Sequence, residues 1–128
     1  MDDTYGKAVW GTRDMSEELL ARQALLQLAD ESGMTYDELL ELWAVETASQ
    51  LASASAALAA GNLREAARLV HSASGASGIC RIVTLADELK TAENLAKEGR
   101  VDAAAQALEK AQQRFTTLNG ALHNGTKS

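Results

Sequence analysis

The sequence predicts an all-α protein, an antiparallel up-down four-helix bundle with an additional short N-terminal helix. Three observations lead to this fold class. The 128 residues contain no proline, and Ala, Leu, Glu, Gln, Arg and Lys, all good helix formers, dominate the composition. Apolar residues recur three and four positions apart in several long segments, which is the spacing of one helix face. The connections between these segments are short, which favours antiparallel neighbouring helices.

The N-terminal region is predicted to contain an arm and a helix. Residues 1–14 include one tyrosine, one tryptophan and two glycines without clear periodicity, so we expect an extended arm. Whether this arm contacts a partner or mediates dimerisation is left open by the sequence. Asp14 and Glu17 have the spacing of a capping box, which predicts a helix that ends near Gly33.

Four longer helices follow. Thr35 and Glu38 form a second capping box, and Asn62 caps the next helix. The last two helices cover about 84–98 and about 101–122. Each helix has an apolar stripe that is expected to face the core: Tyr36, Leu40, Trp43, Thr47, Leu51, Ala54 and Leu58; Leu63, Ala66, Val70, Ala73, Ser77 and Cys80; Leu85, Leu89, Ala92 and Ala96; Val101, Ala104, Leu108, Ala111, Phe115, Leu118 and Leu122.

The chain therefore divides into an arm (1–14), a helical bundle (15–122) and a loose C-terminal tail (123–128). His123 belongs to the tail, and Cys80 is interpreted as a core residue. Neither has the spacing of a metal ligand, and no CxxC, HExxH, P-loop or GxGxxG motif occurs, so no metal or nucleotide site is predicted.

Composition limits the class of protein further. The formal net charge of −6 argues against binding nucleic-acid phosphates over a broad surface. No apolar run reaches the ~18 residues of a membrane span, and the N-terminus lacks a signal-peptide pattern. A single cysteine excludes an internal disulfide and is typical of a cytoplasmic protein. We therefore expect a small, acidic, cytoplasmic helical protein that binds neither nucleic acid nor membrane.

A helical-repeat scaffold is the competing fold. The segments around Gly61 and Gly99 resemble each other, and each joins two helices across a glycine turn, as tetratricopeptide repeats do. These glycines are 38 residues apart, whereas that repeat has a period of about 34. Only two such units occur, without the Trp, Tyr and Pro marks of the repeat, so the bundle is favoured.

The segment VHSASGASGIC, residues 70–80, has the composition of a flexible linker but lies between helical segments. If the third long helix continues through it, its outward face comprises Arg64, Ala67, Arg68, His71, Ser74, Gly75 and Gly78. Glycine inside a helix costs about 1 kcal/mol relative to alanine, so two glycines beside His71 need a reason. We expect a partner protein to approach the histidine over them. Alternatively, residues 72–78 form a loop.

His71 and Gly75, together with the helices on either side, resemble the histidine-containing phosphotransfer (HPt) domain family of multistep phosphorelays. That family has a His-x-Leu-Lys-Gly motif on the second long helix of a four-helix bundle, and these two residues match its histidine and glycine. The next helix contains LADELKTAE, with Glu93 in register. The similarity covers about residues 36–118.

Two positions depart from the family pattern. The Leu-Lys pair is Ala73-Ser74 here, and a later family glycine is Arg81. The missing lysine matters more, because in the family it helps to hold the negative charge of the phosphoryl group.

The resemblance implies a phosphocarrier that neither hydrolyses ATP nor turns over independently. It would carry a phosphoryl group on His71 to or from the aspartate of response-regulator receiver domains, or take it from a hybrid sensor kinase, in two-component signalling. No cofactor is expected on this chain, because Mg²⁺ belongs to the partner receiver. The protein is expected to be a monomer.

Further roles follow from the same resemblance. Glu93 is the candidate to orient the His71 ring and so fix its tautomer. Ser74 could donate a hydrogen bond to the phosphoryl group. Candidate cations near that group are Arg68, Lys90 and Lys97. Residues expected to contact the docked partner are Arg64, Ala67, Gly75 and Gly78. The alternative for Glu93 and for the cations is a solvated charge on an exposed face.

A non-phosphorylated docking protein is the second functional hypothesis. It would keep the bundle and would bind or sequester a receiver or a kinase. The absence of a lysine at Ser74 is its main support.

Overall fold

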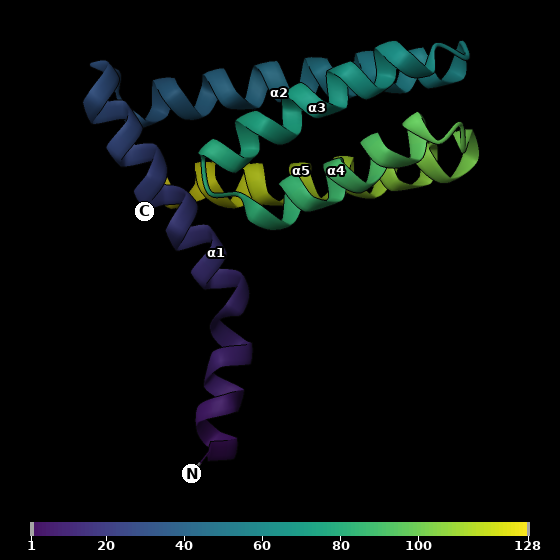
Figure 1. Ribbon diagram of the computed structural model, residues 1–128. Coiled ribbons are helices and arrows are strands. Elements are labelled where there is room, and N and C mark those ends of the chain that lie inside the picture. The colour runs from purple at the N-terminus through teal and green to yellow at the C-terminus, as the bar shows by residue number, and fades with distance from the viewer. Residues whose placement is uncertain (1, 128) are drawn as a thin grey trace.

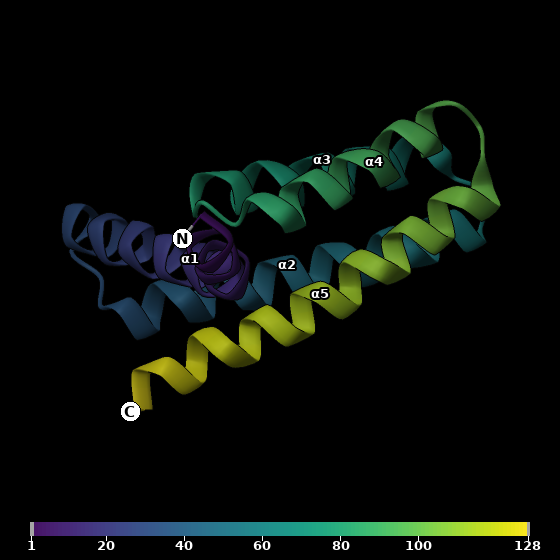
Figure 2. The same ribbon diagram turned by 90° about the horizontal axis from the view of Figure 1, so that it is seen from below.

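Five helices make up the protein, whose computed structural model describes the backbone of residues 2–127 and the side chains of residues 17–124. They are α1 (Asp2–Ser32), α2 (Tyr36–Ala59), α3 (Leu63–Ile79), α4 (Val83–Lys97) and α5 (Val101–Lys127). Helices α2 to α5 run alternately up and down and pack as a bundle, while α1 lies across one end of it (Figure 1). Figure 2 shows the same arrangement from below, with α3 and α4 side by side. The predicted all-α bundle is confirmed, which excludes the repeat scaffold.

Local capping sets the starts of α2 and α3 as predicted. The Glu38 backbone N–H donates to Thr35 Oγ1 at 3.0 Å, and the Thr35 N–H donates to Glu38 Oε1 at 2.9 Å. This reciprocal pair is a complete capping box. At the start of α3, Asn62 Oδ1 accepts from the Glu65 N–H at 3.3 Å. Both helix starts are therefore encoded by side chains within one turn of sequence.

Left-handed residues follow the ends of the first four helices, at Gly33, Gly61, Arg81 and Gly99. Among the described residues Arg81, with φ of 63°, is the only non-glycine with positive φ. The N–H of Ile82 donates to Ser77 O at 2.9 Å and so closes the turn after α3. Arg81 stands where the family resemblance predicts a glycine, so the turn is kept at the cost of an unfavourable backbone conformation.

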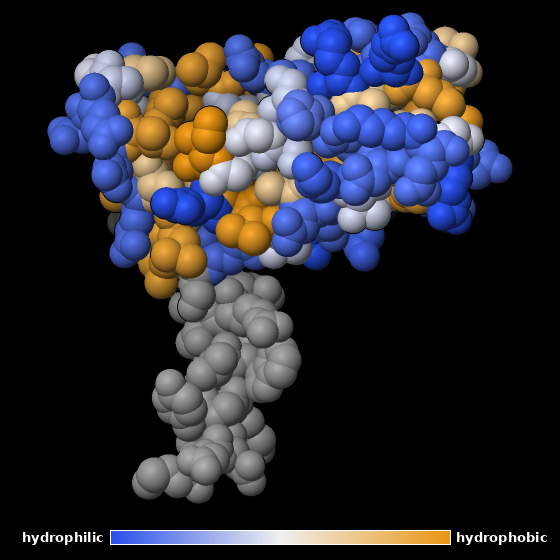
Figure 3. All heavy atoms as spheres, in the orientation of Figure 1, coloured by the Kyte–Doolittle hydropathy of each residue, from blue (hydrophilic) through white to orange (hydrophobic). Residues whose placement is uncertain are grey.

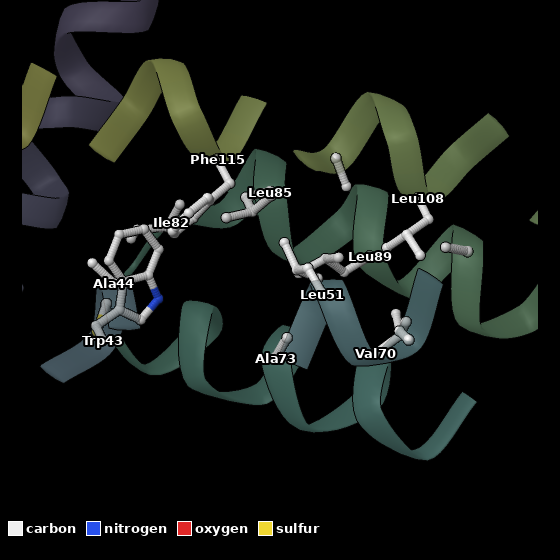
Figure 4. Close-up of a cluster of buried hydrophobic side chains, with 14 of the residues drawn as sticks. Trp43, Ala44, Leu51, Val70, Ala73, Ile82, Leu85, Leu89, Leu108 and Phe115 are labelled. Carbon is white, nitrogen blue, oxygen red and sulfur yellow. The ribbon is translucent and has the colours of Figure 1, made fainter. Parts of the chain in front are cut away.

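The core lies between the four bundle helices and is built from their apolar stripes. Figure 4 shows Leu51, Leu89 and Leu108, which come from three helices, pointing into the same space. The rings of Trp43 and Phe115 pack at a centroid distance of 5.2 Å with a tilted geometry, which adds about 0.5–1.5 kcal/mol to their burial.

Most predicted core positions are buried, including Cys80. Val101, however, is 38 % exposed because it begins α5 at the edge of the bundle. Tyr36, Leu63 and Leu118 are half-buried. The stripe predictions therefore hold best at the middle of each helix.

Helix α1 supplies a cap for α4. The Glu17 carboxylate accepts from the Thr84 backbone N–H at 3.0 Å and from its hydroxyl at 2.8 Å. The N-cap residue of α4, Ile82, makes no side-chain hydrogen bond of this kind. Glu17 thus satisfies a backbone donor at the start of α4 that the helix itself leaves open.

Two features differ from the sequence-based predictions at the two ends of the chain, and a third falls outside the described side chains. Helix α1 begins at Asp2, so the backbone is helical where an extended arm was predicted; no proline interrupts it. The predicted cap Asp14 lies outside the described side chains, and Glu17 caps α4 instead. Helix α5 continues to Lys127, and His123 Nδ1 lies 2.9 Å from Asn119 O within it. The first and last segments are thus helical, while the division of the chain at residues 14 and 122 stays a prediction.

None of the helices, over the residues described, combines the length and the apolar character that a membrane span requires.

Candidate functional site

Helix α3 continues through the Gly- and Ser-rich segment, so the loop alternative for residues 72–78 is wrong. Ala73 and Ser77 face the core, whereas His71, Gly75 and Gly78 are exposed together on the outer face. Among the described residues, a Cβ added at either glycine would meet nothing within 4 Å. Contacts inside the chain therefore give no reason for glycine at these two positions, and the open surface beside His71 is available to another molecule.

Glu93 of α4 holds the imidazole of His71. Nδ1 lies 3.1 Å from each carboxylate oxygen. The histidine side chain is 68 % exposed, whereas that of the glutamate is 2 % exposed. Because an ionised carboxylate only accepts hydrogen bonds, Nδ1 carries the proton and Nε2 of the neutral ring carries the lone pair. Glu93 is thus a buried partner of His71 and not the solvated surface acid of the alternative interpretation.

The charge of Glu93 is itself stabilised. Burial raises its pKa, but the hydrogen bonds from Lys97 and His71 and their charges outweigh burial, so the pKa of Glu93 lies below its usual value. Lys97 Nζ is 2.7 Å from Oε2. The carboxylate is therefore ionised at neutral pH and can stabilise a positive charge on the His71 ring.

The predicted cations differ in how far they are already engaged. Arg68 donates from Nε and Nη2 to the two carboxylate oxygens of Glu65, at 2.8 and 2.7 Å. Lys97 is paired with Glu93. Arg64 and Lys90 are exposed and make no hydrogen bond or ion pair within the described part of the chain. These two side chains are free to interact with an anion.

Two predicted site residues are not placed for their expected roles. The Ser74 hydroxyl donates to the Ala86 carbonyl of α4 at 2.9 Å, so its proton is not available to a phosphoryl group. Ala67 is only 5 % exposed, so it offers a docked partner little area although it lines the groove beside His71. Both lie on the side of α3 that α4 covers, and helical spacing alone does not say which neighbour covers that side.

A groove of about 540 Å³ runs beside His71 along α3 and α4. Its apolar lining comes from Leu63, Ala67 and Ala96, and its charged lining from Arg64, Arg68, Lys97 and Glu93. Figure 3 shows hydrophilic residues over the end of α3 and α4 that is remote from α1, and hydrophobic residues gathered toward α1. The surroundings of His71 therefore change from charged to apolar along the helix pair.

Two exposed apolar residues near the glycines were not predicted from the sequence. Ile79 is 66 % exposed at the end of α3, and Val83 is 53 % exposed at the start of α4. The sequence pattern could have indicated their exposure, because neither residue belongs to the inward stripe of its helix. Like Gly75 and Gly78, they follow His71 in the chain, at the end of α3 and the start of α4.

No group of three or more metal-ligating side chains comes together within the described ranges.

The model of the Hpt domain family matches residues 38–124, which is more than half of the chain. The protein therefore belongs to the Hpt domain family, a class of phosphocarriers that are typically not independent enzymes. No curated protein and no solved structure matched the chain. Membership in this family agrees with the resemblance carried by His71, Gly75 and the surrounding helices.

Proposed function

We propose that the protein carries a phosphoryl group on His71 and exchanges it with the aspartate of a response-regulator receiver domain, or accepts it from a hybrid sensor kinase. One observation supports this best: an exposed imidazole is held at Nδ1 by the buried, ionised carboxylate of Glu93. Nε2 makes no hydrogen bond within the described residues. The ring is thus oriented with its nucleophilic nitrogen available to a partner.

The transfer follows from this geometry. The Nε2 lone pair of His71 attacks the phosphorus of the receiver's acyl phosphate; the N–P bond forms while the P–O bond to the aspartate breaks, and the carboxylate leaves. Nδ1 keeps its proton, so the phosphorylated ring carries a positive charge that Glu93 stabilises. The reverse transfer uses the same path. The receiver supplies Mg²⁺, and this chain contributes position and charge.

The partner would dock on the surface around His71. Gly75 and Gly78 let another backbone approach closely, and the exposed Ile79 and Val83 extend this surface with apolar area. Arg64, which is free on the other side of His71, is available to an acidic group of the partner. We expect a cytoplasmic monomer that forms a transient complex.

The direct test is incubation with phosphorylated receivers of the source organism. We expect acid-labile, alkali-stable phosphate on the chain, and loss of this label in His71→Gln. His123→Gln is the matched control, because it removes the only other histidine of the chain. Label that persists in His71→Gln would overturn the assignment of the phosphoacceptor.

A non-phosphorylated docking protein is the second candidate. It is favoured by Ser74, which replaces the family lysine and whose hydroxyl is bound to Ala86 O. This candidate predicts that the chain binds a receiver equally well with and without His71→Gln, and that no transfer is detected. The same experiment therefore separates the two functions.

A further inference from the structure

The Hpt site of this protein lacks a lysine one turn after its histidine, where Ser74 stands. We propose that Lys90 of α4 supplies the missing positive charge to the phosphoryl group on His71 from across the seam between α3 and α4. This inference rests on the proposed function, because it assigns a further residue to the same site.

Two contacts define how α3 and α4 lie against each other here. His71 Nδ1 meets Glu93 at 3.1 Å, and further along α3 the Ser74 hydroxyl meets the Ala86 carbonyl at 2.9 Å. The two helices are antiparallel, so the residues of α4 between 86 and 93 lie alongside the turn of α3 from His71 to Ser74. Lys90 is in this interval, between the level of His71, which Glu93 marks, and the level of Ser74, which Ala86 marks.

Lys90 also lies on the flank of α4 that borders α3. Successive helical residues are rotated by about 100°, so Lys90 is turned by about 20° from Lys97 and by about 60° from Glu93. Lys97 reaches the Glu93 carboxylate from this flank. Lys90 is exposed, so its flexible side chain can extend along the seam toward His71.

Competing cations are less available on this side of the histidine. Arg68 is held by Glu65, and Lys97 is held by Glu93. Arg64 lines the groove and lies two helical turns before His71, whereas Lys90 lies toward the Gly75 side. Of the candidate cations on α3 and α4, Lys90 is thus the one that combines a place between the levels of His71 and Ser74 with a charge that no partner holds.

The chemistry explains the need for this cation. In the transition state of phosphoryl transfer, charge is spread over the three equatorial oxygens of the phosphoryl group, so a nearby ammonium lowers the barrier. Because Lys90 is exposed, its contribution is that of a solvent-screened charge, and we expect its removal to slow phosphorylation about five- to tenfold.

Phosphoramidate is a suitable donor for the test, since a small molecule needs no docking surface. Nε2 of His71 forms the N–P bond, the P–N bond of phosphoramidate breaks, and ammonia leaves. The rate of adduct formation is followed by intact-protein mass spectrometry for the wild type, Lys90→Gln and Lys110→Gln. Lys110→Gln is the matched control, because this exposed α5 lysine lies away from the groove and its removal changes the net charge equally.

A rescue variant makes the test specific. Ser74→Lys puts a lysine at the family position, and we expect it to restore the rate in the Lys90→Gln background while adding little to the wild type. If the wild type is phosphorylated and His71→Gln is not, equal rates for Lys90→Gln and Lys110→Gln would overturn the role of Lys90 and leave the proposed function standing. A wild type that takes no phosphoryl group would overturn the proposed function and this inference together.

Discussion

Replacing Glu93 by glutamine probes how the site activates its histidine. Glutamine has the same shape, and its amide oxygen can still accept from Nδ1, but it cannot balance a positive charge on the phosphorylated ring. A hydrogen bond to a charged group contributes about 1.5–3 kcal/mol, against about 0.5–1.5 kcal/mol for a neutral one. The difference of about 1–2 kcal/mol, applied to the transition state, predicts a phosphotransfer rate about five- to thirtyfold lower in Glu93→Gln.

The assay is single-turnover transfer from a phosphorylated receiver, with His71→Gln as the inactive reference. Glu109→Gln is a matched control, because Glu109 is an exposed carboxylate of α5 and is not among the residues that line the groove beside His71. Transfer by Glu93→Gln at the wild-type rate, with His71→Gln inactive, would refute the idea that the buried carboxylate stabilises the charged ring.

The same carboxylate makes a prediction about acid stability. The pKa of Glu93 is lowered in the folded protein, so its ion pairs contribute stability that is complete above the ordinary value of 4.5. This contribution is lost as the pH falls below that value and through the folded-state pKa. The check is urea unfolding at a series of pH values from neutral to acidic. The free energy of unfolding is expected to fall more steeply in the wild type than in Glu93→Gln, and parallel curves would contradict this assignment.

Three further substitutions test the account. Arg81→Gly removes a side chain from a left-handed position and is expected to raise the free energy of unfolding by about 0.5–1 kcal/mol in urea titrations; a decrease would contradict the strain at this turn. Glu17→Gln weakens the hydrogen bonds that cap α4 at Thr84. It is expected to lower the free energy of unfolding by about 0.5–2 kcal/mol and to speed hydrogen exchange at the start of α4. An unchanged exchange rate there would show that the cap contributes nothing. Gly75→Ala enters open space on a helix, so it is expected to stabilise the chain by about 0.5–1 kcal/mol yet slow transfer from a receiver; unimpaired transfer would argue against close approach at this position.

Features encoded within a few residues could be predicted from the sequence. The capping box of Thr35 and Glu38 works through side chains one turn apart, and the apolar stripes follow from the helical period, so the bundle was predictable. The pairing of His71 with Glu93 was predictable only through the family resemblance, since spacing alone does not relate two different helices.

Features that depend on how helices meet were not predictable in this way. Glu17 caps a helix that begins 66 residues further along the chain, a contact that no local pattern signals. Ala67 and Ser74 lie on the boundary between the exposed face of α3 and the side covered by α4, and only the packing of α4 decides their role. Helix α1 extends to Asp2 although its first residues show no amphipathic period.

The central claim is that His71 is the phosphoacceptor. Its most direct test is to incubate the wild-type chain with phosphorylated receivers and to map the phosphoryl group by mass spectrometry under alkaline conditions, which preserve phosphohistidine. The account predicts a single modified residue, His71, with full modification retained in His123→Gln. A phosphoryl group mapped to any other residue, or receiver binding with no modification at all, would contradict it.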